Sequence, residues 1–205
     1  MTTAYPELIV GAYGWDHVDW QGVFYPDDLP KDWRLTYYAN EFRSVYVPQP
    51  VWLDASMDEL EKWADDTPDE FYFFLELKGG NGDAKFIDDV SQRIKIFDEK
   101  LRGVIAHDAL MVLPDARCYY DAGYSDPAAG EHGHVCWRPG YPGRLCDVAL
   151  MDAASQQQDQ KALAQMIRAY LDQTGPCEVA WLFFEGSPAI SVLHETVTIA
   201  QLLGA

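Results

Sequence analysis

The chain has 205 residues, of which 48% are hydrophobic, and this is enough to bury the core of one compact domain spanning residues 1–205. Its 33 acidic side chains outnumber the 15 basic ones, and the resulting formal charge of −18 repels phosphate backbones, so we expect no nucleic-acid partner. The apolar runs are too short to span a bilayer, and residues 1–6 lack the pattern of a signal peptide, so we expect a cytoplasmic protein without a membrane partner.

The first fifty residues predict the opening unit of a β/α repeat. An apolar strand at residues 8–10 runs into a glycine-rich and aromatic loop at residues 11–15, and an amphipathic helix then ends near residue 42. In folds of this type, the loops at the carboxyl ends of the strands hold the functional site. The loop that contains Tyr13 and Trp15 is therefore a candidate for the wall of a pocket.

Strand and helix patterns continue to alternate along the chain, which is typical of parallel α/β architecture. Pro48 and Pro50 predict a turn after the second strand, and Ser56 with Glu59 predicts a capping box at the start of the next helix. We expect strands at residues 44–47, 71–77, 109–113 and 179–184, and helices at residues 57–64, 86–101, 162–171 and 189–203. Residues 115–147 show only short apolar stretches at 118–120 and 135–137, and a further stretch follows at 148–151.

The order of the opening motifs resembles the start of the YecE-like family, the bacterial domain of unknown function 72. Members begin with Gly-x-x-Gly-Trp, continue with Trp-x-Gly-x-Phe-Tyr-Pro and reach Leu-Pro before an aromatic helix. This chain matches these motifs at residues 11–15, 20–26 and 29–30, and residues 60–73, 110–114 and 178–204 are similar to later family elements. The resemblance implies a TIM-type (β/α) barrel with mostly parallel strands and outer helices. Since such barrels typically need about 250 residues, we expect an abridged barrel that has lost a β/α unit, or reduced it to a loop, within residues 115–147.

The chain also departs from the family pattern at the strand ends. Where the family carries Glu-x-Asn-Ser-Thr-Phe-Tyr after its second strand, residues 46–52 read Tyr-Val-Pro-Gln-Pro-Val-Trp. A family lysine falls on Glu76, a glutamine on Val112 and a closing Asn-Asn on residues 184–185, while Arg138 matches a family arginine and Asp121 a family glutamate. The family has no established reaction, so the resemblance implies a fold and a site rather than an activity.

Charged side chains also fall at the predicted strand ends. By alternation with its leucine neighbours, Glu76 points to the opposite face from them, and Lys78 shares that face. An inward carboxylate must be paired or solvated by a cavity, so Glu76 belongs either to a pocket or to a structural ion pair with Lys78 or Arg138. The candidate catalytic residues are Glu76, Asp121 and Glu185, and the candidate ligand-binding residues are Tyr13, Trp15, Gln49, Lys78 and Arg138.

Aromatic side chains at strand ends can line a pocket for a ring-bearing or sugar-like ligand, although core packing explains each of them equally well. Those considered are Tyr13, Trp15, Trp20, Trp52 and Trp137.

Other motifs give weaker signals. The spacing of His132 and His134 suits a metal pair, but the flanking glycines favour a loop, so we expect no metal and no cofactor. Residues 79–82 favour a βα turn over a phosphate-binding loop, and the four cysteines lack zinc-ligand spacing.

Three functions stay open at this point. The leading hypothesis is a protein that binds a small molecule at the carboxyl ends of the strands. The alternatives are a hydrolase or isomerase that uses carboxylates for acid/base chemistry, and a non-catalytic protein-interaction domain. The sequence leaves both the identity of the ligand and the oligomeric state open.

Overall fold

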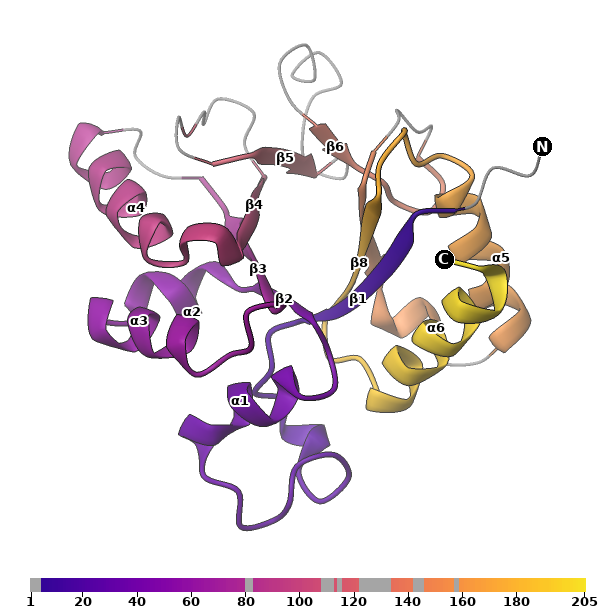
Figure 1. Ribbon diagram of the computed structural model, residues 1–205, viewed down its shortest axis with the longest axis horizontal. Helices are drawn as coiled ribbons and strands as arrows, with labels where there is room; N and C mark the ends of the chain where they lie inside the picture. The colour runs from indigo at the N-terminus through magenta and orange to yellow at the C-terminus, as the bar shows by residue number, and fades with distance from the viewer. Residues whose placement is uncertain are drawn as a thin grey trace.

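The computed structural model describes residues 5–79, 83–107, 113, 116–121, 134–141, 146–156 and 159–205. Within these residues, eight parallel strands form one sheet that curls into a nearly closed barrel with helices on its outside (Figure 1). The spatial order is β6-β5-β4-β3-β2-β1-β8-β7. The strands are β1 (Glu7–Tyr13), β2 (Ser44–Val47), β3 (Tyr72–Leu77), β4 (Leu101–Ala106), β5 (Cys118–Asp121), β6 (His134–Cys136), β7 (Val148–Asp152) and β8 (Val179–Glu185).

The barrel closes between β6 and β7, the two strands at the ends of this order. Trp137, which follows β6, forms an isolated parallel bridge with Ala149. Its backbone N–H donates to the Val148 carbonyl at 2.8 Å, and its own carbonyl accepts from the Leu150 N–H at 2.9 Å. One residue therefore joins the two ends of the sheet.

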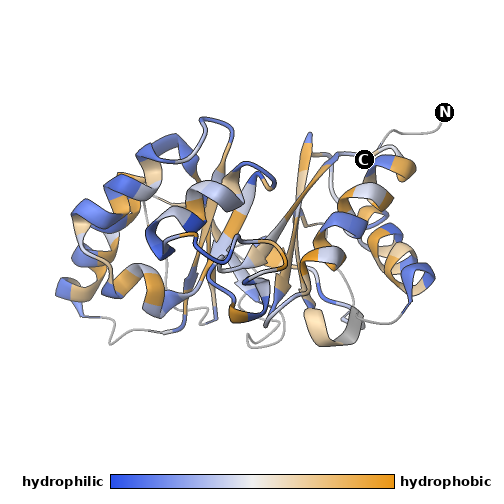
Figure 2. Ribbon diagram, turned by 90° about the horizontal axis from the view of Figure 1, so that it is seen from below, coloured by the Kyte–Doolittle hydropathy of each residue, from blue (hydrophilic) through white to orange (hydrophobic). Residues whose placement is uncertain are grey.

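Six α-helices occur in the described residues. They are α1 (Arg34–Ala39), α2 (Gln49–Asp54), α3 (Met57–Asp65), α4 (Ala84–Ile96), α5 (Gln160–Leu171) and α6 (Ile190–Leu203). Figures 1 and 2 show α3 and α4 on one side of the barrel and α5 and α6 on the opposite side. The capping box at Ser56 is confirmed, because the Ser56 hydroxyl accepts from the Glu59 N–H while the Glu59 carboxylate accepts from the Ser56 N–H. None of these helices has the length and apolar character needed to cross a membrane.

The strands are buried on both faces, which explains their nearly continuous apolar sequences. One set of side chains fills the barrel, and the alternate set packs against the helices. Several strands are orange in Figure 2, whereas the helices carry both colours because one side of each faces solvent. The residues inside the barrel are Ile9, Tyr46, Phe74, Ile105, Tyr119, Cys136, Val148, Leu150, Trp181 and Phe183. The four cysteines are free thiols, and Cys136 and Cys146 are buried.

The predicted bounds of one helix were wrong. The helix expected over residues 86–101 ends at Ile96, because Asp98 adopts a left-handed φ of 44° and Leu101 begins β4. Leu101 matches the spacing of the helix only by coincidence, since it belongs to the next strand. The strand expected at residues 109–113 lies outside the described residues except for Leu113. The turn expected at Pro48 and Pro50 is the start of α2, since proline is compatible with the first turn of a helix.

The barrel is shortened without the loss of a strand. The apolar stretches in the middle of the chain form β5, β6 and β7, so all eight strands are present. Between β4 and β7, the described residues 107, 113, 116–121, 134–141 and 146–147 contain no helix. Strands of three or four residues are too short to show the alternation by which a longer strand is predicted.

Gly11 occupies a point where β1 and β2 approach closely. A Cβ atom there would lie 2.5 Å from the Ser44 carbonyl oxygen and 2.9 Å from the Phe183 ring. We expect Gly11→Ala to lower the free energy of unfolding by about 1–3 kcal/mol, because the backbone of β2 would have to move. Urea denaturation measures this loss. The control, Thr198→Ala on the exposed side of α6, should change stability by less than about 0.5 kcal/mol. Equal stability of the two variants would contradict the close approach.

Candidate functional site

The carboxylate of Glu76 is the centre of a cluster at the carboxyl ends of β1, β2 and β3. It is only 1% exposed. The Tyr13 hydroxyl donates to Oε2 at 2.7 Å, and the backbone N–H of Gln49 donates to the same oxygen at 3.1 Å. Lys78 Nζ lies 2.8 Å from Oε1, and the Lys78 N–H donates to the Gln49 side chain. Four of the candidate residues are thus brought together.

His107 and Tyr46 complete this cluster, and neither is among the site residues predicted from the sequence. His107 Nε2 lies 3.4 Å from Glu76 Oε1 and 3.4 Å from the Tyr46 hydroxyl. His107 was missed because the fourth strand was placed after it rather than before it. The available signal was the apolar stretch at residues 103–106, which a histidine follows directly.

Several hydrogen bonds hold Glu76 in its charged form. Burial alone would raise the pKa of its carboxyl group, but hydrogen bonds from His107, Lys78, the Gln49 N–H and Tyr13 outweigh burial and lower this pKa to about 2. Burial and the neighbouring Glu76 carboxylate raise the pKa of Tyr13 to about 12. At neutral pH the cluster therefore contains a carboxylate, an ammonium group and a neutral phenol.

Arg138 is the centre of a second cluster, which joins β5 and β8. Its guanidinium donates to both oxygens of Asp121, with Nη2 to Oδ2 at 2.5 Å, and its Nη1 lies 2.6 Å from Glu185 Oε2. The Asp121 side chain is fully buried, whereas that of Glu185 is 23% exposed. Burial would lower the pKa of Arg138, but these carboxylates raise it above its ordinary value, so the guanidinium stays charged.

Tyr46 lies between the two clusters. Burial raises the pKa of its hydroxyl well above the usual value, and the charges of Glu76 and Glu185 add to this effect. Its ring packs on Tyr13 and Phe183 inside the barrel. Its hydroxyl is therefore neutral at ordinary pH and lies 3.4 Å from His107 Nε2.

Trp15 does not join the charged clusters. It is 7% exposed and its ring meets Trp63 edge to face at 5.0 Å. With Tyr13, Trp15 also lines a separate cavity of about 420 Å³ next to the Glu76 cluster, together with Gly14, Asp16, His17, Lys31, Pro48, Val51 and Gly186.

Core packing explains the other tryptophans considered above. Trp52 donates to the Glu76 carbonyl and Trp20 to the Pro188 carbonyl, both from buried positions, and Trp137 packs against Tyr170.

The described residues contain no group of three metal-ligating side chains arranged to hold an ion. Of the His132 and His134 pair, only His134 is described, and it lies in β6. In the loop at residues 79–82, only Gly79 is described.

A family model described as "Protein of unknown function DUF72" matches residues 9–113, which is just over half of the chain. The chain belongs to the DUF72 family. Among curated proteins, a search finds no match to its sequence.

Solved structures share the fold at low sequence identity. A DUF72 protein from Thermotoga maritima is 15% identical, with a TM-score of 0.62 over 97% of this chain and 100% of the other. A DUF72 protein from Enterococcus faecalis is 10% identical, with a TM-score of 0.67 over 95% of each chain. A D-psicose 3-epimerase solved in the presence of D-fructose is 9% identical, with a TM-score of 0.60 over 96% of this chain and 100% of the epimerase. These likenesses establish a TIM-type barrel for this DUF72 chain.

Proposed function

We propose that this DUF72 chain binds a small polar, sugar-like molecule at the carboxyl ends of its strands. The observation that carries the proposal is the position of Lys78. Its side chain is 51% exposed, yet Glu76 and the hydroxyl of Tyr13 hold its ammonium group in one place. A positioned donor that still reaches solvent is suited to contact a ligand.

The second cluster supplies the complementary chemistry. Glu185 is partly exposed and offers a carboxylate acceptor, while Arg138 holds it in place. Hydroxyl groups both donate and accept hydrogen bonds, so a polyhydroxylated ligand matches donors on one side and an acceptor on the other. Because the chain carries a charge of −18, we infer that this ligand is not a nucleic acid.

A ligand panel tests the proposal through thermal stability. D-fructose and D-psicose are the first probes because the epimerase shares the fold, and aldohexoses and polyols complete the panel. At a hundred times its dissociation constant, a bound ligand stabilises the fold by about 2.7 kcal/mol, which raises Tm by several degrees. We expect such a rise for the wild type and its loss in Lys78→Met.

The matched control is Lys62→Met. Lys62 is on α3 and pairs with Asp32 at an exposed site. Its replacement therefore removes one positive charge, as Lys78→Met does, but at a distance from the carboxyl ends of the strands. This variant should respond to the ligand as the wild type does. A response retained in Lys78→Met, or no response to any panel member, would contradict the proposal.

A second candidate is an isomerase or hydrolase that uses acid/base chemistry. The observation that favours it is the pairing of Glu76 with the His107 imidazole at the barrel mouth. A carboxylate can orient an imidazole for proton transfer, and Glu76 itself is ionised at neutral pH. Conversion of a panel sugar by the wild type, lost in His107→Gln while the ligand still raises Tm, would distinguish this chemistry from binding alone.

A further inference from the structure

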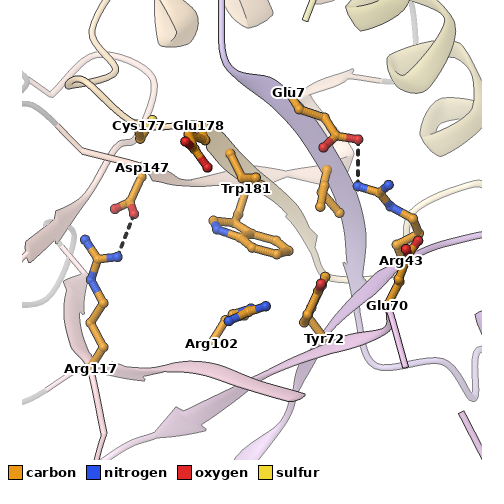
Figure 3. Close-up of a pocket in the computed structure, with 12 residues that line it drawn as sticks. Glu7, Arg43, Glu70, Tyr72, Arg102, Arg117, Asp147, Cys177, Glu178 and Trp181 are labelled. Carbon is orange, nitrogen blue, oxygen red and sulfur yellow. Dashed lines mark hydrogen bonds and ion pairs between the residues drawn. The ribbon is translucent and has the colours of Figure 1, made fainter. Parts of the chain in front are cut away.

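The opposite end of the barrel, at the amino ends of the strands, contains a cavity of about 510 Å³ (Figure 3). This volume is within the range of small-molecule sites. Its apolar wall is formed by Ile9, Val179 and Trp181. Its charged lining consists of three arginines, Arg43, Arg102 and Arg117, and four carboxylates, Glu7, Glu70, Asp147 and Glu178.

Two of the three arginines are neutralised by neighbouring carboxylates. Arg43 Nη2 lies 2.8 Å from Glu7 Oε1, and Arg117 Nη1 lies 3.0 Å from Asp147 Oδ2, as the dashed lines in Figure 3 show. These pairs fix the two sides of the cavity. They leave Arg102 as the arginine whose charge is available to a ligand.

Arg102 is held by an aromatic ring rather than by an acid. Its guanidinium carbon lies 4.1 Å from the centroid of the Tyr72 ring, and within the described residues its side chain makes no hydrogen bond or ion pair. A guanidinium stacked on a ring keeps its N–H groups free at its edge. Arg102 is also exposed, so these donors face the cavity that it lines.

Trp181 provides a second donor without a partner. Its side chain is 6% exposed and stands in the middle of the lining residues in Figure 3. Within the described part of the chain, its indole N–H makes no hydrogen bond, and it is not one of the fully buried polar atoms without a partner, so a ligand in the cavity can reach it. The same ring contacts Tyr72 edge to face at 5.3 Å, so both donors share one aromatic platform.

We propose that this cavity binds a small monocarboxylate with a flat apolar body. Arg102 pairs with the carboxylate, Trp181 donates a further hydrogen bond, and the apolar wall covers the body of the ligand. Glu70 and Glu178 also line the cavity and form no ion pair among the described residues, so the ligand can carry one negative charge, placed at Arg102, whereas these two carboxylates repel a dianion such as phosphate. The site is separate from the one proposed above, since the two lie at opposite ends of the strands.

Isothermal titration calorimetry with benzoate tests the proposal on the full chain. We expect saturable binding to the wild type and at least about tenfold weaker binding to Arg102→Gln, the loss expected for one charge-assisted hydrogen bond. Trp181→Phe keeps an aromatic ring but removes the N–H, and should weaken binding by about threefold to tenfold. Benzamide, the neutral analogue, and inorganic phosphate should bind at least about tenfold more weakly than benzoate.

Two control variants make the result specific to this cavity. Arg168→Gln removes an exposed arginine from α5, and Lys78→Met alters the opposite end of the barrel. Both should bind benzoate with a dissociation constant within about twofold of the wild-type value. Unchanged binding by Lys78→Met would show that this cavity is independent of the site proposed at the carboxyl ends of the strands. Melting temperatures of all variants check that each is folded. No saturable benzoate binding, equal binding by Arg102→Gln, or phosphate binding as tight as benzoate would overturn the proposal.

Discussion

Replacing Arg138 with methionine is expected to lower the free energy of unfolding by about 3–5 kcal/mol. The guanidinium pairs with the fully buried Asp121 and with Glu185, so its removal leaves two carboxylates facing each other without their shared cation. Methionine retains much of the apolar stem and isolates the loss of charge. Urea denaturation at pH 7 measures the change.

A double variant separates this electrostatic loss from a packing defect. Adding Asp121→Asn to Arg138→Met removes the buried charge, so we expect it to restore at least about 1 kcal/mol of the lost stability. The exposed Arg168→Met on α5 is the control for loss of a positive charge and should cost less than about 0.5 kcal/mol. A loss below about 1 kcal/mol in Arg138→Met, or no recovery in the double variant, would contradict the role of this cluster.

Glu76→Gln is expected to remove much of the acid sensitivity of the fold. The pKa of Glu76 is lowered from 4.5 to about 2, so its contribution to stability is complete above pH 4.5 and is lost as the pH falls toward 2. At about 1.4 kcal/mol for each pKa unit, this contribution is about 3 kcal/mol. Urea denaturation at several pH values between 2.5 and 6 gives the free energy of unfolding as a function of pH. Toward low pH, this free energy should fall less steeply for the variant than for the wild type, and this acid part of the curve is called the acid limb below.

Glu61→Gln is the matched control, since it removes an exposed carboxylate from α3 without touching the cluster. Its acid limb should run parallel to that of the wild type. The same Glu76→Gln variant also distinguishes the two roles considered for this residue. Because the variant is expected to melt at a lower temperature in either case, the ligand response decides: no response in either protein favours a structural ion pair, whereas a response of the wild type that is lost in the variant favours a site.

The fold was predictable from the sequence because local and family signals agree. The motif at residues 11–15 and the apolar strand at residues 71–77 each indicate a β/α unit, and their repetition predicts a parallel α/β architecture, while the barrel was implied by the resemblance to the family. The inward position of Glu76 was also predictable, because a buried parallel strand alternates between two fixed faces. Lys78 and Tyr13 contact Glu76 from the ends of strands that the apolar patterns of the sequence also predicted.

The residues that were missed or misjudged depend on tertiary packing. His107 reaches Glu76 only because β4 begins at Leu101, and no periodic pattern separates that strand from the preceding helix. The position of the Trp15 side chain depends on α3, because Trp63 of that helix packs against the Trp15 ring. Arg138 and Asp121 were identified through the family resemblance, and the pairing of short strands brings them together.

The single-residue bridge at Trp137 has a consequence for self-association. β1 and β8 are paired over six residues, whereas two backbone hydrogen bonds join the ends of the sheet beside Trp137. Local opening of a protein starts where the fewest hydrogen bonds must break. Opening here would expose the unpaired edges of β6 and β7, and exposed edges are templates for pairing with another chain. An intact bridge therefore keeps these two edges covered, and its loss would allow strand exchange between copies of the chain and aggregation.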